Sequence, residues 1–370
     1  MAFFATIFFL AFGMLQAQEN SWINYNQQYF KIQVVRDGMY RIYKSDLILA
    51  DIPANIINAD HLQIFHNGEE QYIYISGVNS DGTLETNGYI EFYGQRNRGT
   101  DEYDFYDSPE SMINPDVSIY NDTAAYFLTW NFMSGNRRMA VVSETDYDSH
   151  YDNRQAYCFR EKRTNYTGKY YASNTRSYFT ESEGWMDATT LSTGGLNKSV
   201  ATAGAYTSGP DTRVEIAVGG IHTSSQSFFN QPHHLTVTTQ NQTWVDTIYN
   251  GYGFIRKHFN IPSSGLTGST TLRFVADYDE NDKNAIAYID IKYPHTWNFE
   301  NSSSFEFELD INGNDSRDYL EISNFASGSG AVLYDLTNHR RILTTSEGTL
   351  KCLAGSTDTY RKMILVGSGG

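Results

Sequence analysis

The stretch Tyr29-Phe-Lys-Ile-Gln-Val-Val-Arg-Asp-Gly-Met-Tyr-Arg-Ile-Tyr43 sets a pattern that most of this chain repeats. Apolar and polar residues alternate over 29–35, as they do along a half-buried strand. Asp37-Gly38 follows, and this dipeptide is a strong hairpin signal because both residues tolerate a positive φ. Residues 39–43 then alternate again. The stretch therefore predicts two strands joined as a hairpin.

The same alternation recurs downstream, whereas helical periodicity is nearly absent. Asn67-Gly68 and Asn87-Gly88 are predicted turns, the first between strands at 62–65 and 71–75, the second before a strand at 89–93. Only 45–50 and 54–59 suit short turns of helix. The aromatic content of 15% favours pleated, half-buried surfaces. Further strands are predicted at 124–130, 213–218, 235–239, 270–275, 285–291, 305–309, 319–322, 331–334 and 362–366.

These patterns predict an all-β chain of tandem β domains that includes a β-sandwich or jelly-roll-like module. A length of 370 residues suits two to three domains. The Gly-Ser-Gly-Gly end fits either a linker or a gene product cut short before another domain. The expected parts are an N-terminal β domain at 22–142, an irregular polar connecting segment at 143–205, a β-sandwich domain at 206–297 and a further β module at 298–370.

The N-terminus has the features of a targeting segment. Residues 2–15 are almost wholly apolar, and Gln16-Ala17 and a polar stretch follow. A short apolar run that ends at a small residue predicts a secretory signal peptide at 1–17, cleaved near Ala17. No Lys or Arg precedes the run, which leaves open a start upstream of Met1. No other stretch is apolar enough to cross a bilayer, so we expect an exported protein with no transmembrane segment after cleavage.

The charge balance excludes one class of partner. The formal net charge is −16, and a chain this acidic repels a phosphate backbone, so we expect no nucleic acid. The sequence also lacks a long basic run that would bind an anionic membrane.

No set of residues for catalysis is evident. Cys158 lies between two aromatic residues and Cys352 lies in Leu-Lys-Cys-Leu, and neither has the surroundings of a catalytic thiol. Their spacing does not decide whether they form a disulfide, and two half-buried unpaired thiols are the preferred interpretation. The adjacent His233 and His234 would point to opposite faces of a strand, so we do not expect them to share a zinc ion.

One loop is a candidate for calcium, although we expect no cofactor as the simpler case. The stretch 310–321 carries oxygen-bearing side chains at alternate positions, which resembles the ligand spacing of an EF-hand loop. Asp315 stands where such a loop needs glycine, and the flanks alternate like strands, so a polar hairpin turn is the preferred interpretation. The candidate ligands are Asp310, Asn312, Asn314, Asp318 and Glu321.

Three tryptophans are candidates for a carbohydrate platform, since aromatic rings stack on sugar faces. They are Trp185, Trp244 and Trp297. Because β cores use aromatic residues routinely, core packing is the preferred interpretation for each.

Several segments resemble, in order, the N-terminal region of gingipain-like cysteine peptidases. The first two segments are 29–32 and 37–42. The others are Leu62-Gln-Ile-Phe-His-Asn-Gly68, Asn87-Gly-Tyr-Ile-Glu-Phe-Tyr-Gly94, Asn114-Pro115, Asn121-Asp-Thr-Ala-Ala-Tyr-Phe-Leu-Thr-Trp130 and 332–338. Near the end the chain departs from the family, which has Trp at the position of Tyr334 and Pro at that of His339. The order and spacing are similar to those of the sortases of the type IX secretion system, over essentially the whole mature chain.

The resemblance implies a parent protein with a function that this chain lacks alone. In the family a caspase-like α/β domain follows, with a His base and a Cys nucleophile, and nothing in this chain matches either. No catalytic residue is therefore carried over. The parent would act in the periplasm or at the outer-membrane surface, where it would remove the C-terminal sorting domains of exported cargo. The implied partners are that cargo and other secretion-system components, and the β modules would position the catalytic domain or hold partners.

Other hypotheses stay open beside this one. The chain could be a stand-alone cell-surface binding module, an adhesin or a carbohydrate binder without enzymatic activity, or a purely structural surface protein. A separate hypothesis concerns modification: the sequences around Thr123 and Thr247, Asp-Thr-Ala and Asp-Thr-Ile, resemble the O-glycosylation pattern of Bacteroidetes.

Overall fold

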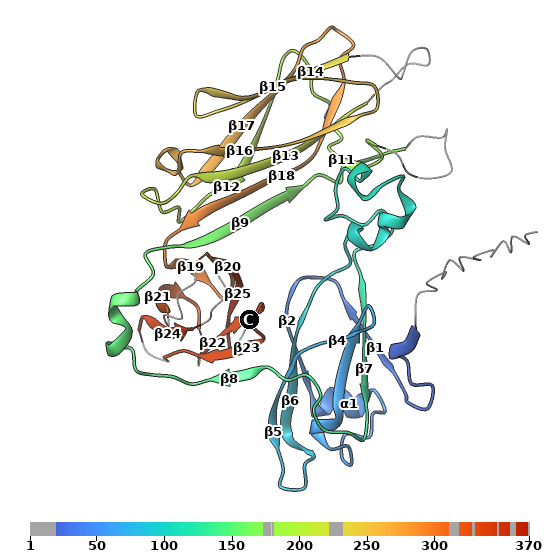
Figure 1. The fold of residues 1–370 in the computed structure, drawn as a ribbon, viewed down its shortest axis with the longest axis vertical. Coiled ribbons are helices and arrows are strands. Elements are labelled where there is room, and N and C mark those ends of the chain that lie inside the picture. Colours follow the sequence, from blue (N-terminus) through green and yellow to red (C-terminus); the bar gives the residue numbers. More distant parts are fainter. Residues whose placement is uncertain are drawn as a thin grey trace, which may run out of the picture.

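A computed structural model describes residues 20–172, 179, 181–221, 232–310, 318–327, 330–345, 348–355 and 360–368. The expected signal peptide at 1–17 lies outside these ranges. Figure 1 shows an N-terminal module in blue, a middle module in green to orange above it and a C-terminal module in red beside the first. The all-β prediction is confirmed. Within the described ranges, no helix is long and apolar enough to cross a membrane.

The N-terminal module is a sandwich of two sheets, ordered β1-β7-β3-β4 and β2-β6-β5. Residues of both sheets, such as Val34, Ile64 and Phe92, are 0% exposed in the core between them. The predicted helical turn at 45–50 is α1, whereas 54–58 forms no helix and Ala59 begins the 3-10 helix η2. The elements are η1 (Asn20–Trp22), β1 (Phe30–Val34), β2 (Gly38–Tyr43), α1 (Lys44–Leu49), η2 (Ala59–His61), β3 (Leu62–His66), β4 (Glu69–Glu70), β5 (Ile73–Val78), β6 (Leu84–Gly94), η3 (Gly99–Phe105), η4 (Pro109–Ser111) and β7 (Ala124–Trp130).

The strands predicted on either side of Asp37-Gly38 form, but they do not pair with each other. β1 pairs with β7, and β2 pairs with β6. The hairpin prediction is therefore wrong, because the chain at Asp37-Gly38 crosses from one sheet of the sandwich to the other. Turn chemistry specifies that the chain reverses, whereas the partner of each strand depends on which face it buries.

The two Asn-Gly dipeptides differ in outcome. Asn67 and Gly68 have φ angles of 47° and 82° and form the predicted turn. The turn joins β3 to the short β4, whereas the strand predicted at 71–75 is β5, which pairs with β6. Asn87-Gly88 lies inside β6, so the prediction of a turn there is wrong. Gly88 packs against a bulge of β5 at Gly77, where an added Cβ would lie 2.5 Å from the Gly77 carbonyl oxygen. Glycine is needed there for a close approach of two backbones.

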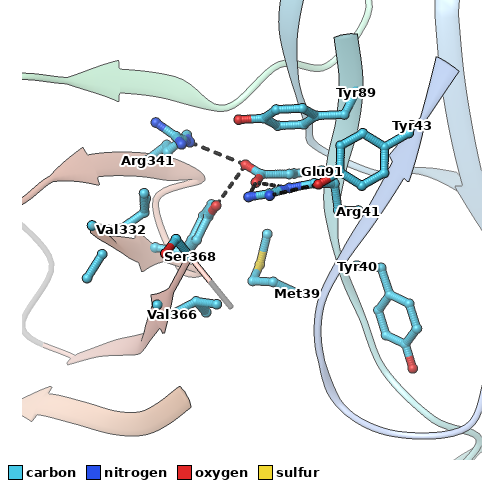
Figure 2. Close-up of a pocket in the computed structure, with 14 residues that line it drawn as sticks. Met39, Tyr40, Arg41, Tyr43, Tyr89, Glu91, Val332, Arg341, Val366 and Ser368 are labelled. Atoms are coloured by element: carbon cyan, nitrogen blue, oxygen red, sulfur yellow. Dashed lines mark hydrogen bonds and ion pairs between the residues drawn. The ribbon is translucent and has the colours of Figure 1, made fainter. Parts of the chain in front are cut away.

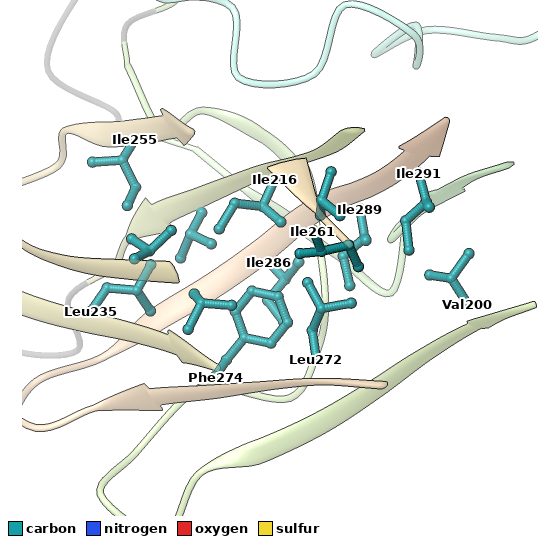
Figure 3. Packing of buried hydrophobic residues seen from close by; sticks show 14 of the residues in the cluster. Val200, Ile216, Leu235, Ile255, Ile261, Leu272, Phe274, Ile286, Ile289 and Ile291 are labelled. Atoms are coloured by element: carbon teal, nitrogen blue, oxygen red, sulfur yellow. The ribbon is translucent and has the colours of Figure 1, made fainter. Parts of the chain in front are cut away.

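The middle module packs the sheet β12-β17-β14-β15 against the strands β16-β13-β18-β9. Figure 3 shows Ile216, Leu235, Phe274 and Ile289 in the core between the layers, and each is 0% exposed. Two layers of this kind fit the predicted sandwich. The elements are β9 (Cys158–Asn165), β10 (Lys169–Tyr171), β11 (Gly184–Met186), β12 (Leu196–Ala201), β13 (Thr212–Gly220), β14 (Pro232–Thr239), β15 (Gln242–Asn250), β16 (Phe254–Ile261), η6 (Ser263–Gly265), β17 (Ser269–Ala276) and β18 (Asn284–His295).

β9 lies in the stretch 143–205, which we expected to be irregular. Its residues 160–163 are Arg-Glu-Lys-Arg, and this run of charge hides the alternation of a strand. The guanidinium carbon of Arg160 lies 3.7 Å from the centroid of the Phe305 ring, and that of Arg163 lies 3.6 Å from the Tyr288 centroid. Long charged side chains thus cover apolar surface here. The domain bounds as such stay a prediction.

The C-terminal module packs β20-β25-β22-β23-β8 against β19-β21-β24. Its core includes Phe299, Phe305, Leu333 and Leu365, each at most 1% exposed. β20 pairs with both β25 and β9, so one long sheet continues from the middle module into this one. The elements are β8 (Ala140–Val142), η5 (Asp148–Asn153), β19 (Asn298–Ser302), β20 (Ser304–Asp310), β21 (Asp318–Phe325), β22 (Ala331–Asp335), β23 (Arg340–Leu343), β24 (Leu350–Ala354) and β25 (Tyr360–Gly367).

Candidate functional site

The N-terminal and C-terminal modules meet at a junction between the sheet β2-β6-β5 and the strands β22, β23 and β25. Side chains alternate across a strand, so Ile90 and Phe92 of β6 enter the N-terminal core while Glu91 faces outward. At the junction, aromatic and apolar residues of both modules form one cluster, in which Met139, Tyr334 and Ile364 are buried and the others partly buried. They are Met39, Tyr72, Tyr74, Tyr93, Met139, Val332, Tyr334, Leu336, Ile364 and Val366.

Glu91 is the centre of this junction. It is 2% exposed, and partners occupy both of its carboxylate oxygens (Figure 2). Arg41 of β2 donates to Oε1 from Nε at 3.0 Å and from Nη2 at 2.6 Å. Oε2 accepts from the Tyr334 hydroxyl at 2.7 Å and from Arg341 Nε at 3.3 Å. One carboxylate of the N-terminal module therefore holds two side chains of the C-terminal module.

The charges of the cluster do not cancel. Burial raises the pKa of Tyr334 and the charge of Glu91 raises it further, so the hydroxyl stays protonated and donates. Two guanidinium groups, of Arg41 and Arg341, face the single carboxylate of Glu91, which leaves a surplus of one positive charge. This positive surplus lies in a chain with a net charge of −16.

Two cavities flank the contact between Glu91 and Tyr334. The larger has a volume of about 580 Å³ and lies along β2, with the end of β22 and the end of β25 as its opposite wall. The smaller has a volume of about 260 Å³ and lies near β4, where His339 stacks on Tyr72 with the ring centroids 3.6 Å apart. Ligand pockets commonly have volumes of about 300–1,000 Å³, so the larger cavity is the candidate site.

The chemistry of the candidate site suits recognition rather than catalysis. Its lining provides guanidinium groups, phenol hydroxyls and apolar side chains, and no cysteine or histidine. None of the sequence motifs indicates this site, although the residues of β6 carry a signal. Tyr89, Glu91 and Tyr93 share the outward face of β6, and two aromatic residues opposite the core indicate a second packing surface.

The two cysteines are unpaired, as predicted, but they are fully buried rather than half-buried. Cys158 and Cys352 are free thiols in the C-terminal core, 1% and 0% exposed. Burial raises the pKa of Cys352 to about 12, and burial also raises the pKa of Cys158. Neither thiol is therefore a thiolate nucleophile at neutral pH.

The two adjacent histidines point to opposite faces of β14, as predicted. His233 is 0% exposed, with Nδ1 2.7 Å from Asp282 Oδ1. His234 lies nearer the surface between Asp246 and Asp277, with its ring nitrogens 2.8 Å and 2.6 Å from their carboxylates. Over the described part of the chain, no group of three or more metal-ligating side chains that could hold an ion is found.

The calcium prediction falls partly outside the described residues. Asn312 and Asn314 lie in 311–317, and the described candidates are Asp310, Asp318 and Glu321. Asp318 is 1% exposed and its Oδ2 lies 2.5 Å from Arg361 Nη2. Glu321 is three positions further along β21, on the opposite face, and pairs with Arg154 at 2.6 Å. The ligand set stays a prediction, and two of its carboxylates already have partners within the protein.

The three tryptophan candidates are covered to different degrees. Trp297 is 8% exposed in the C-terminal core, so the prediction of core packing is confirmed for it. Trp244 is half-buried and stacks on Phe259, with 5.7 Å between ring centroids. Trp185 is half-buried beside Tyr170. None of the three stands fully exposed as an open platform.

Comparison with known proteins identifies a similar fold. Neither a family model nor a curated protein sequence matches the chain. The crystal structure of dimeric latent PorU from Porphyromonas gingivalis matches with a TM-score of 0.59 and 10% identity, over 95% of this chain and 32% of that chain. This chain thus spans about a third of the length of the PorU chain that it matches.

Two further matches are too low to carry an argument. The CBM36-1 domain of a multidomain xylanase from the hindgut metagenome of Trinervitermes trinervoides has a TM-score of 0.22 and 14% identity, over 36% of this chain and 95% of that one. The ANX2 ectodomain from Arabidopsis thaliana has a TM-score of 0.23 and 8% identity, over 72% of this chain and 83% of that one.

Proposed function

We propose that this chain is the non-catalytic N-terminal portion of a secreted gingipain-like cysteine peptidase, a PorU-like sortase of the type IX secretion system. The observation that carries the proposal is the match to PorU over 95% of the chain, because it includes all three modules rather than one common sandwich. The segments that resemble gingipain-like peptidases lie toward both ends of this chain, in 29–130 and in 332–338.

In the parent protein this portion acts as a support. The long sheet crosses from the middle module into the C-terminal module, and Glu91 attaches the N-terminal module to that unit. Packed, sheet-linked elements hold a neighbouring site in a fixed geometry better than loops do. Removal of C-terminal sorting domains from exported cargo belongs to the remainder of the parent. Its partners are that cargo and other secretion-system components at the cell surface.

An in-frame deletion of the codons for residues 20–368 in the source bacterium tests the proposal. We expect exported proteins to retain their C-terminal sorting domains in the deletion strain, which mass spectrometry of their C-terminal peptides detects. A strain with Gly268→Ala is the matched control, because an added Cβ there has nothing within 4 Å. Normal processing in the deletion strain together with lost adhesion to glycans would instead support the stand-alone binding module.

A further inference from the structure

The larger cavity at the junction borders β2, a strand at the edge of its sheet, and also Tyr89 and Glu91 of β6. β2 pairs with β6, and within the described chain no strand pairs with its other side. Four residues of β2 line the cavity: Met39, Tyr40, Arg41 and Tyr43. A sheet edge presents unpaired N–H and C=O groups and is a template for a further strand.

The hydrogen bonds at the end of β2 show which of its main-chain groups are free. In an antiparallel ladder, alternate residues turn both their N–H and their C=O toward the partner strand. The N–H of Tyr43 donates to Asp46 Oδ2 at 2.9 Å and so does not bond to β6. Met39 and Arg41 have the same parity as Tyr43, so their N–H and C=O groups also point away from β6, at the free edge of β2.

The other side of β6 gives the same result independently. Ile73 of β5 turns away from β6, because its N–H donates to the Arg137 carbonyl and its C=O accepts from the Met139 N–H. β5 therefore bonds to β6 through Tyr74, which lies opposite Glu91. The neighbours of Glu91 in β6, Ile90 and Phe92, therefore bond to β2. Their partners there are Ile42 and Tyr40, on either side of Arg41.

The space beside β2 fits an added strand. Neighbouring strands lie about 4.7–4.9 Å apart, and the cavity next to β2 has a volume of about 580 Å³. Its walls offer apolar contacts from Met39, Val332 and Val366. Proteins commonly guard an exposed edge with proline, a bulge or a charged side chain. β2 has no proline and no bulge, and its one charged side chain, Arg41, is bound to Glu91.

The positive charge of the cavity favours an added strand that carries a carboxylate. Glu91 has both carboxylate oxygens occupied, while Arg41 and Arg341 together carry one positive charge more than Glu91 neutralises. Arg41 is accessible, with 36% of its side chain exposed. A carboxylate next to Arg41 would balance this surplus, whereas a cationic side chain would be repelled.

We propose that this cavity binds an extended acidic peptide of another protein, which adds to β2 as a further strand and places a carboxylate against Arg41. The main chain of β2 supplies the affinity and the guanidinium groups supply the charge preference, as in other cases of strand addition. The site does not depend on the proposed sortase function, because it is built only from residues of this chain.

The probe is a fluorescein-labelled peptide of alternating Val and Thr with one central Asp, and its control has Lys in place of Asp. We expect the Asp peptide to bind the full chain at least about tenfold more tightly than the Lys peptide in fluorescence anisotropy, which corresponds to one well-placed charge contact. Hydrogen exchange should slow at the amides of Met39 and Arg41 when the Asp peptide binds. Equal affinity for both peptides, or unchanged exchange at β2, would overturn the proposal.

A proline substitution tests the main-chain contact. Met39→Pro removes an N–H that does not bond to β6, so the sheet should tolerate it as edge strands do. We expect the Asp peptide to bind about tenfold more weakly to Met39→Pro than to Met39→Leu, which keeps the N–H. Unchanged affinity in Met39→Pro would contradict the proposal, as would a peptide-independent dimer joined at β2, because a second copy would then be the occupant. If Met39→Pro does not fold, exchange in the unmodified chain decides.

Discussion

A single buried carboxylate, that of Glu91, organises the contact between the N-terminal and C-terminal modules. Glu91→Gln keeps the shape of the side chain but leaves the guanidinium groups of Arg41 and Arg341 without their counter-charge. We expect the free energy of unfolding to fall by about 2–3 kcal/mol, below the full effect of a buried pair because Arg41 is partly exposed. Urea denaturation measures this change.

Glu306→Gln is the control for Glu91→Gln. The Glu306 side chain is 38% exposed and lies 3.6 Å from Lys362. It also accepts from the Tyr93 hydroxyl at 3.1 Å, and the amide oxygen of Gln keeps that bond, so we expect a loss below about 1 kcal/mol. Equal losses in the two variants would show that the junction does not depend on the Glu91 charge.

The ion pair of Asp318 and Arg361 is buried, with side chains 2% and 1% exposed. Arg361→Met removes the cation and leaves a buried carboxylate, so we expect a loss of about 3–5 kcal/mol. Arg361→Met combined with Asp318→Leu removes both charges and should recover most of that loss. A double variant whose loss equals the sum of the single losses, measured by urea denaturation, would contradict this account.

His295 should make the protein less stable in acid. It is 0% exposed, and burial lowers its pKa. The hydrogen bond to the Thr296 carbonyl raises the pKa, and the positive charge of Arg160 lowers it further. The unfolded chain, with a histidine pKa of about 6.5, binds the proton more readily than the folded chain. The contribution of His295 to the free energy of unfolding is therefore complete above about pH 6.5. It is lost as the pH falls toward the pKa that His295 has in the folded protein.

Melting temperatures across about pH 8 to about pH 5 test the role of His295. The loss on acidification should be smaller in His295→Gln than in the unmodified chain. His234→Gln should behave in the opposite way, because a hydrogen bond to Asp246 raises the pKa of His234, which then stabilises the protein at low pH. Identical slopes in all three proteins would show that these histidines do not set the pH response.

At the scale of strands, the hairpin of β5 and β6 depends on a close approach of two glycines. An added Cβ on Gly88 would lie 2.5 Å from the Gly77 carbonyl oxygen, closer than real Cβ contacts. We expect Gly88→Ala to destabilise the protein by about 1–3 kcal/mol, because the backbone of β5 must move. Gly268→Ala, with free space around it, should be neutral or stabilising by about 0.4–1 kcal/mol. Comparable melting temperatures for the two variants would contradict the role given to Gly88.

Sequence patterns predicted where strands lie better than which strands pair. The predicted alternation is correct for β7, β13, β17 and β20. In a half-buried strand, the residues of the core face are apolar and those of the solvent face are polar, so they alternate along the sequence. The reversal at Asp37-Gly38 also occurs. Its strands join different sheets, however, and only the non-local burial of their faces decides that outcome. β9 was not predicted, since its charged side chains lie over aromatic rings that come from distant strands.

At the scale of the molecule, the outward face of β6 indicates that a second packing surface exists, but not which residues cover it, because the parts of the candidate site lie far apart in the chain. Glu91 contacts Tyr334 and Arg341, which are 243 and 250 residues further along. No local pattern encodes such a contact, and each residue taken alone fits an ordinary strand. The family resemblance, by contrast, depends on ordered local segments, and it agrees with the whole-chain match to PorU.

The central claim is that this chain supports a peptidase whose catalytic thiol lies elsewhere in the parent protein. The most direct measurement is the length and thiol reactivity of the native polypeptide, captured from the source bacterium with antibodies against residues 20–368. The account predicts a polypeptide about three times as long as this chain, since the chain covers 32% of the PorU chain, with a reactive cysteine other than Cys158 and Cys352. A native polypeptide of about 42.0 kDa, or one without a reactive thiol, would contradict the account.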